Sequence, residues 1–127
     1  MSTTTELTDT NFESVINGND IVLVDFWATW CGPCTQFAPI FEKSAQENPD
    51  IVHAKLDTEA AQQVAIAAGI TAIPTLMAFR EGVLVFNQAG ALPAPALAEV
   101  VQMVRALDMG KVRAEIAGDK SAAPDGD

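Results

Sequence analysis

Apolar residues along this chain follow two spacings that alternate with each other. Residues 21–27 form a run of β-branched and aromatic side chains, interrupted by one carboxylate, Asp25. A run that is apolar on both faces is typical of a central strand covered on both sides. Residues 51–56 predict a second buried strand, and the region of Glu6 and Leu7 predicts a short edge strand.

The segments between these strands carry apolar residues at helical spacing, which predicts four helices. These run from Thr8 or Asp9 to Gly18, from about Cys34 to Glu47, from Thr58 to Gly69, and from Pro95 through Leu107. Residues 75–79 and 83–87 are strands joined at residues 80–82, the pattern of an antiparallel hairpin. The order β-α-β-α-β-α-β-β-α predicts an α/β protein, a central mixed sheet of about five strands flanked by about four helices.

The carboxyl-terminal segment has a different composition. From Gly110 the chain is rich in Gly, Ala, Asp and Ser. Such a composition buries too little apolar surface to offset the entropy of ordering. We therefore expect one domain over residues 1–109 and an acidic, mostly disordered tail over residues 110–127, with a further docked helix as the alternative.

Composition and charge exclude several functions. The chain has 127 residues, of which 49% are hydrophobic, enough for one domain with its own core. Asp and Glu total 17 against 7 Lys and Arg, a formal net charge of −10, which disfavours binding to nucleic acid or to an anionic membrane. No stretch approaches the roughly 18 apolar residues of a membrane span. The first ten residues lack the basic and apolar regions of a signal peptide, so we expect a cytoplasmic protein, and we expect a monomer.

The two cysteines, Cys31 and Cys34, lie three positions apart between a predicted strand and a predicted helix. A helix amino terminus presents unpaired N–H groups and the positive end of the helix dipole, and both stabilise a thiolate on Cys31. We expect Cys31 to be exposed and Cys34 to be buried beneath Trp27. Exposed Cys31 then attacks a disulfide in a partner, and Cys34 resolves the mixed disulfide.

Other interpretations fit the same two cysteines. A structural disulfide is one, although it closes a very small loop and stabilises little. Half of a metal site, completed by a second chain, is another, because this is also a metal-ligand spacing. The cysteines would be inert thiols in a third, and in a fourth the domain is a docking module without activity.

Asp25 is the candidate proton acceptor for Cys34. Its sequence neighbours are apolar, and burial of an unpaired carboxyl raises its pKa toward the range that suits acid–base chemistry. Lys55, in a predicted neighbouring strand, is placed to offset part of its charge. The alternative is that Asp25 marks a strand end or a position that faces solvent.

A second candidate feature is Ile73-Pro74, between two predicted strands. Sequence alone favours an ordinary trans proline there, while a cis bond would leave the Ile73 backbone free to pair with an extended substrate. On this layout Trp30, Ile73 and Gly90-Ala91 surround Cys31 with an apolar patch, the alternative for Trp30 being core packing. The single histidine, His53, is expected to be a surface or packing residue.

The segment from Val24 to Cys34, with sequence VDFWATWCGPC, resembles the active-site signature of the thioredoxin family. The stretch from His53 to Glu59 resembles the actinobacterial branch of that family. The resemblance covers about residues 5 to 108. Similar residues also stand at Pro39, Lys55, Gly69-Ile70, Ile73-Pro74-Thr75, Gly82 and Gly90-Ala91-Leu92.

This resemblance implies a thioredoxin fold and a dithiol–disulfide oxidoreductase that reduces substrate proteins. It implies Cys31 as the nucleophile, Cys34 as the resolving cysteine in a redox disulfide with Cys31, Asp25 as the buried acid and a cis bond before Pro74. It implies no bound cofactor, with electrons supplied from NADPH through a flavin-containing thioredoxin reductase. The expected substrate-binding surface comprises Trp30, Gly32, Pro33, Ile73, Pro74, Gly90 and Ala91.

Pro33 indicates the direction of the reaction. A histidine before the second cysteine would favour the reduced thiolate and make an oxidant, whereas Pro33 resembles the reducing members of the family. The chain departs from the family at Thr35, where many members have a basic residue, and at Thr58, where a bulky apolar residue often stands. Pro93 and Pro95 replace a more flexible loop. These departures bear on partner preference and redox potential.

Overall fold

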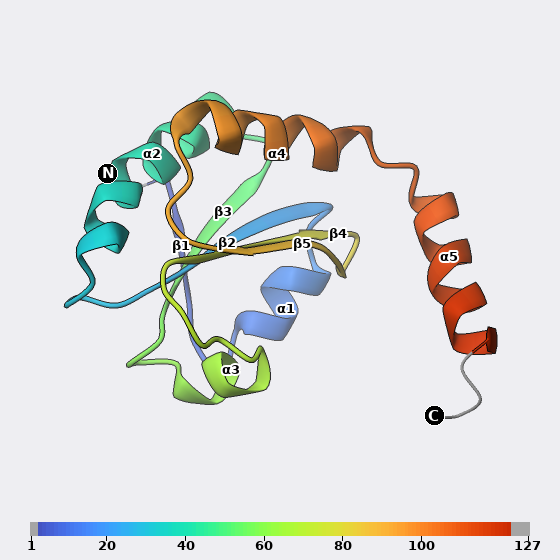
Figure 1. Ribbon diagram of the computed structural model, residues 1–127, viewed down its shortest axis with the longest axis horizontal. Helices are drawn as coiled ribbons and strands as arrows, with labels where there is room; N and C mark the ends of the chain where they lie inside the picture. Colours follow the sequence, from blue (N-terminus) through green and yellow to red (C-terminus); the bar gives the residue numbers. More distant parts are fainter. Residues whose placement is uncertain (1–2, 123–127) are drawn as a thin grey trace.

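Five strands form one mixed sheet at the centre of the computed structural model, which describes residues 3–122 and the side chains of residues 3–118 (Figure 1). The strand order is β1-β3-β2-β4-β5. β3 pairs in parallel with β1 and β2, while β4 pairs antiparallel with β2 and β5. The strands are β1 (Thr5–Leu7), β2 (Ile21–Trp27), β3 (Val52–Asp57), β4 (Thr75–Arg80) and β5 (Val83–Ala89). The α/β architecture and the hairpin are therefore confirmed.

Helices cover both faces of this sheet (Figure 1). α2 (Gly32–Glu47) and α4 (Ala94–Ala106) lie on one face, and α1 (Phe12–Asn17) and α3 (Gln62–Ala67) lie on the other. Among the helices within residues 3–122, none is both long enough and apolar enough to cross a membrane.

The central strand β2 explains why its sequence is apolar almost throughout. Leu23 packs with Phe37 and Phe41 of α2, whereas Val24 and Phe26 belong to the core on the side of α1 and α3. Since successive side chains alternate between the faces of a strand, Asp25 shares the face of Leu23 and lies beneath α2.

The four predicted helices all begin at residues other than those predicted, with α1 starting at Phe12 and α4 at Ala94. α2 begins at Gly32, just after Cys31. α3 begins at Gln62 because residues 58–61 form a turn around the end of β3. In that turn Asp57 Oδ1 accepts from Glu59 N at 2.9 Å, and Asp57 O accepts from Ala61 N at 2.8 Å.

The prediction of a disordered segment from Gly110 is wrong for the described part of that segment. A further helix, α5, runs over Met109–Ala122. Asp108 Oδ1 accepts from Lys111 N at 3.1 Å, Met109 is buried, and Arg113 forms an ion pair with Glu81. These contacts offset the low helix propensity of the glycines. Residues 123–127 lie outside the described residues, and the division into domain and tail stays a prediction.

Candidate redox site

Cys31 and Cys34 are joined in a disulfide where β2 gives way to α2, with their Cα atoms 5.3 Å apart. Cys31 is the residue that caps α2. The Cys34 backbone N–H donates to Cys31 Sγ at 3.2 Å, and Thr35 N donates to Cys31 O at 3.2 Å. The start of one helix therefore holds both cysteines close together.

The start of α2 favours negative charge on Cys31 Sγ when the disulfide is reduced. The first turn of this 16-residue helix contains no acidic residue, so the positive end of its dipole is not offset there. The Cys34 N–H adds a hydrogen bond directed at the same sulfur atom. Both effects lower the free energy of a thiolate relative to a thiol.

Cys31 is less exposed than the sequence predicts. Its exposed fraction is 5%, against 4% for Cys34. Ala28 and Ile73 pack around the disulfide, and Ile73 O lies 3.7 Å from Cys31 Sγ. Trp30, by contrast, is 69% exposed, so the core-packing alternative for this side chain is wrong.

Asp25 is completely buried, and neither of its carboxyl oxygens has a hydrogen-bond partner among the described residues. Burial raises the pKa of Asp25 to about 6, an effect that the nearby charge of Lys55 partly opposes. A carboxyl with this pKa exchanges protons near neutral pH. The alternative of a solvent-facing Asp25 is therefore wrong.

Lys55 lies beside Asp25, as the sequence predicts. The two residues are register partners between β2 and β3. The Lys55 ammonium nitrogen lies 4.9 Å from the centroid of the Trp27 ring, a cation–π contact that holds its charge close to the site.

A loop from the other side of the sheet completes the surroundings of Cys31. The Ile73–Pro74 peptide bond is cis, as the resemblance implies. Pro74 O accepts from Gly90 N at 2.7 Å, which brings the end of β5 to this loop. Gly90 has a φ of 101°, a conformation that favours glycine. Gly32, Pro33 and Ala91 are exposed.

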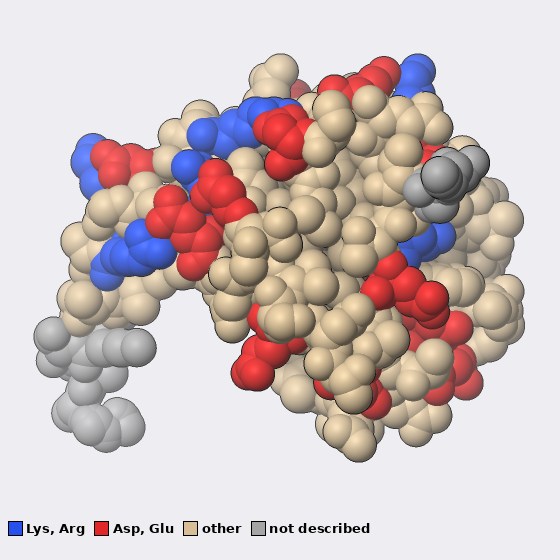
Figure 2. All heavy atoms as spheres, turned by 180° about the vertical axis from the view of Figure 1, so that it is seen from behind, with Lys and Arg blue, Asp and Glu red and all other residues tan. Residues whose placement is uncertain are grey.

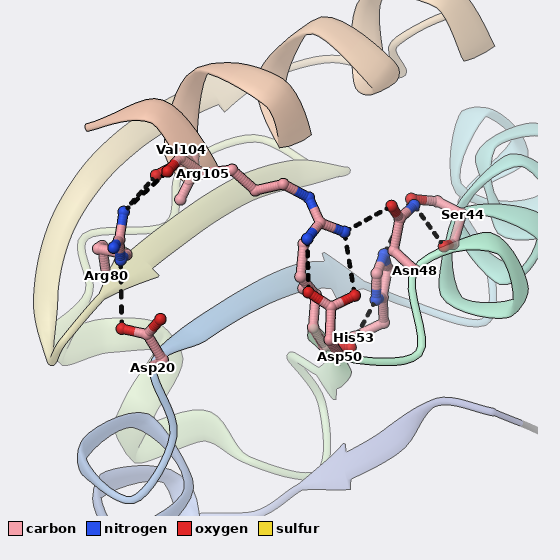
Figure 3. A network of polar contacts seen from close by, with 9 residues as sticks. Asp20, Ser44, Asn48, Asp50, His53, Arg80, Val104 and Arg105 are labelled. Atoms are coloured by element: carbon pink, nitrogen blue, oxygen red, sulfur yellow. Dashed lines mark hydrogen bonds and ion pairs between the residues drawn. The ribbon is translucent and has the colours of Figure 1, made fainter.

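His53, which the sequence predicts to be a surface or packing residue, is buried at the other end of α2 (Figure 3). Its Nε2 lies 2.9 Å from Ser44 Oγ and its Nδ1 lies 3.1 Å from Ile51 O. Burial lowers the pKa of this imidazole. His53 is therefore a packing residue, in a strand that also carries Lys55 and Asp57.

Cysteines joined at a strand-to-helix junction, with an unpaired buried carboxyl beneath the same helix, define a thiol–disulfide oxidoreductase. Among the residues that the structure describes, no group of three or more His, Cys, Asp or Glu is placed to hold a metal ion.

Comparison with known proteins gives the family. The Thioredoxin family model matches residues 3–103. A thioredoxin homologue from Streptomyces coelicolor is 52% identical over 123 residues, which cover 97% of this chain and 92% of that protein. Thioredoxin 1 from Nostoc is 40% identical over 104 residues, which cover 80% of this chain and 97% of that protein. The chain belongs to the thioredoxin family and is a thiol–disulfide oxidoreductase.

Solved structures of thioredoxins share the fold of this chain. Oxidised mitochondrial thioredoxin 3 from Saccharomyces cerevisiae superposes with a TM-score of 0.72 at 35% identity, covering 78% of this chain and 93% of that chain. A mutant thioredoxin from Halobacterium salinarum superposes with a TM-score of 0.76 at 33% identity, covering 82% of this chain and 92% of that chain.

Proposed function

We propose that this protein reduces disulfides in other proteins, with Cys31 as the attacking and Cys34 as the resolving cysteine. The observation that carries this assignment is the hydrogen bond from Cys34 N to Cys31 Sγ at the start of α2, since it favours the thiolate at Cys31.

The reaction transfers two electrons in two exchange steps. The Cys31 thiolate attacks one sulfur of the partner disulfide, forming a mixed disulfide, and the other partner sulfur leaves as a thiolate that takes a proton. The Cys34 thiol then loses its proton and attacks Cys31 Sγ. This forms the Cys31–Cys34 disulfide and releases the second partner sulfur, so that the partner is reduced and this protein is oxidised.

Asp25 accepts the proton that Cys34 loses. Its position beneath α2, its lack of hydrogen-bond partners among the described residues and its raised pKa support this role. Lys55 is a positioning residue, because its charge limits how far the pKa of Asp25 rises.

The partner binds against the apolar surface around Cys31. This surface comprises Trp30, Gly32, Pro33, Ile73, Pro74, Gly90 and Ala91. The exposed indole of Trp30 and the contact between Ile73 O and Cys31 Sγ support a segment that lies across the disulfide.

The protein works as a reductant in the cytoplasm. Its own disulfide is reduced by a thioredoxin reductase, which carries electrons from NADPH through a flavin. Pro33 between the cysteines supports the reducing direction. We expect a redox potential more negative than about −200 mV in equilibrium with glutathione, on the side of the cytosolic reductants.

Insulin reduction driven by NADPH and thioredoxin reductase tests this proposal. We expect turnover with the wild type and none with Cys31→Ser. Cys34→Ser should hold substrates in a mixed disulfide on Cys31, visible by intact mass. Normal release from Cys34→Ser would show that the two roles are assigned wrongly, and no turnover with the wild type would rule out the proposed electron path.

A further inference from the structure

A groove of about 510 Å³ lies on the face of the sheet that α1 and α3 cover. Met77 and Phe79 of β4 line it from the sheet, while Phe12 of α1 and Val64 line it from the helices. Neither cysteine belongs to its lining. Since small-molecule sites have volumes of about 300–1,000 Å³, the groove has the size of a binding site that is separate from the disulfide.

The lining of this groove is mostly apolar, and its aromatic wall is held in place. The rings of Phe12 and Phe79 pack edge to face, with their centroids 6.1 Å apart and an interplanar angle of 83°. Leu84 of β5 also lines the groove and is 46% exposed. A ligand that covers this side chain removes apolar surface from water, which favours binding. The lining therefore favours a ligand with an aromatic or aliphatic body.

Two carboxylates, Asp9 and Glu13, are the charged groups of the lining. Asp9 Oδ1 accepts a hydrogen bond from Val64 N at 3.0 Å, which fixes this carboxylate against the start of α3. Glu13 is exposed in the first turn of α1. Among the residues whose side chains are described, neither carboxylate forms an ion pair. The groove thus offers two negative charges to a cationic ligand.

The surroundings of the groove are also negatively charged. In Figure 2 the charged atoms in the lower part of the view, at the end of the molecule where Figure 1 places α1 and α3, belong to Asp and Glu. The Lys and Arg atoms on that face lie higher or toward α5. With a formal net charge of −10, the chain attracts small cations and repels small anions.

We propose that this groove binds a small organic cation. The aromatic or aliphatic body of the ligand lies against Phe12, Phe79 and Leu84, and its ammonium group lies near the two carboxylates. An acid with the same body is repelled, so the groove separates amines from acids. This inference goes beyond the proposed function and does not depend on it, because neither cysteine contributes to the groove.

Three probes with one shared body test the charge preference. These are 4-phenylbutylammonium, 4-phenylbutanol and 4-phenylbutanoate, which differ in their head groups. We expect a dissociation constant of about 1 mM for the ammonium at low salt, from the size of the ligand. The alcohol should bind about fivefold more weakly, and the carboxylate more weakly still. At 1 M salt the difference between the ammonium and the alcohol should fall below about twofold.

Methionine methyl groups report where the probes bind. In protein labelled with ¹³C at these methyl groups, the Met77 signal should shift and saturate as the ammonium is added, because Met77 lines the groove. Met103 of α4 and Met109 of α5 lie outside the groove and are the internal controls. Their signals should stay where they are.

Charge variants assign the preference to the two carboxylates. Glu13→Gln and Asp9→Asn should each reduce the preference for the ammonium over the alcohol by about twofold, and the two together should abolish it. Asp9→Asn keeps an oxygen that accepts from Val64 N, so the position of α3 is retained. Glu99→Gln makes the same change in net charge at an exposed position of α4 and should leave the preference unchanged.

A pair of apolar variants tests the body of the ligand. Leu84→Ser should weaken the binding of all three probes by about threefold to fivefold, because the apolar cover is lost. Ile66→Ser is the matched control, since Ile66 is 79% exposed on α3 but does not line the groove. It should leave all three dissociation constants unchanged.

Saturable binding in the stated order of affinities would support the proposal. Equal affinity for the ammonium and the carboxylate would overturn it, as would the absence of a saturable shift at Met77 with any probe. Equal shifts at Met103 and Met109 would show unspecific contact and would also overturn it. If an acetylated Lys-Phe-Leu amide binds more than tenfold more tightly than the ammonium, the occupant is a polypeptide segment and the proposal is wrong. Insulin reduction by the same variants should stay within twofold of the wild type, so failure at the groove leaves the reductase proposal standing.

Discussion

Asp25 and His53 are both buried beneath α2 on the same face of the sheet, but their surroundings differ. The ring nitrogens of His53 lie within hydrogen-bond distance of Ser44 Oγ and Ile51 O, while the Asp25 oxygens have no partner among the described residues. Burial acts on both groups, raising the pKa of Asp25 to about 6 and lowering the pKa of His53. The satisfied group contributes to stability, and the unsatisfied group is free to take up a proton.

The same contrast extends to the neighbouring side chains. Around His53, Arg105 bridges Asp50 and Asn48, and Asn48 Nδ2 donates to Ser44 O (Figure 3). At the cysteine end, the hydrogen bonds of the described side chains join them to the backbone, as from Cys34 N to Cys31 Sγ and from Thr58 Oγ1 to Trp27 O. The ion pairs of the described residues lie at the end away from the cysteines.

The largest expected effect is on the chemistry of the cysteine end. Asp25→Asn should slow release of the mixed disulfide by about 100-fold at pH 7, because the proton acceptor for Cys34 is lost. The first attack by Cys31 should change by less than about threefold. Stopped-flow kinetics of both steps check this, with Glu99→Gln as a control for charge. Equal slowing of both steps would contradict the assigned role.

The second largest effect is expected on the free energy of unfolding, from a change at His53, at the end of α2 away from the cysteines. His53→Ala should lower the free energy of unfolding by about 3 kcal/mol, because it removes a buried ring and leaves Ser44 without its partner. Release of the mixed disulfide should stay within twofold of the wild type. Urea unfolding and the same kinetics check this, and Ser44→Ala, expected to cost about 1 kcal/mol, is the matched variant. A large loss of activity in a folded variant would contradict the separation of the two ends.

A pH titration of stability sharpens the comparison. The folded-state pKa of Asp25 is raised, so its burial penalty is fully present above about pH 6 and is relieved as the pH falls toward 3.8. The folded-state pKa of His53 is lowered, so its contribution is present above pH 6.5 and is lost as the pH falls below that. The two groups therefore act in opposite directions in mildly acidic solution.

The measurement is the difference in unfolding free energy between Asp25→Asn and the wild type, both oxidised. This difference isolates Asp25 from the other titrating groups. The variant should be the more stable at pH 8, and its advantage should shrink by about 1 kcal/mol or more at pH 5. A difference that does not vary with pH would mean that Asp25 is not buried in an unpaired state.

The smallest effect is expected from the surface ion pair between Arg105 and Asp50. Arg105→Gln should lower Tm by less than about 3 °C at low salt, because exposed pairs contribute little. The shift should decrease further at 1 M NaCl as the charges are screened. Calorimetry at two salt concentrations checks this, and a shift as large as that of His53→Ala would show that the pair supports the buried network.

The fold was predictable where the pattern that indicates an element lies within a few consecutive residues. The run at residues 21–27 predicts a strand covered on both faces, and β2 is that strand. The hairpin of β4 and β5 follows from two apolar runs around a glycine-containing turn. The candidate site could be predicted for the same reason, because Cys31, Cys34 and Asp25 lie within ten residues of one another.

What the sequence could not supply depends on contacts between distant residues. The low exposure of Cys31 comes from Ile73, which is 42 positions away. One partner of His53, Ser44 Oγ, comes from α2, nine positions away, whereas the other, Ile51 O, is local. α5 is held by Arg113 and Glu81, 32 positions apart, although its own composition favours disorder. In each case a tertiary contact overrides a local tendency.

The place of β2 in the sheet has a consequence for motion. Its backbone is hydrogen-bonded on one side to β3 and on the other to β4, and the cysteine pair begins four residues after its end. Amide hydrogens in such a strand exchange with solvent only through the rarest opening events. Cys31 Sγ thus follows closely after the strand whose amide hydrogens we expect to exchange most slowly. Partners therefore meet a nucleophile whose position varies little over time.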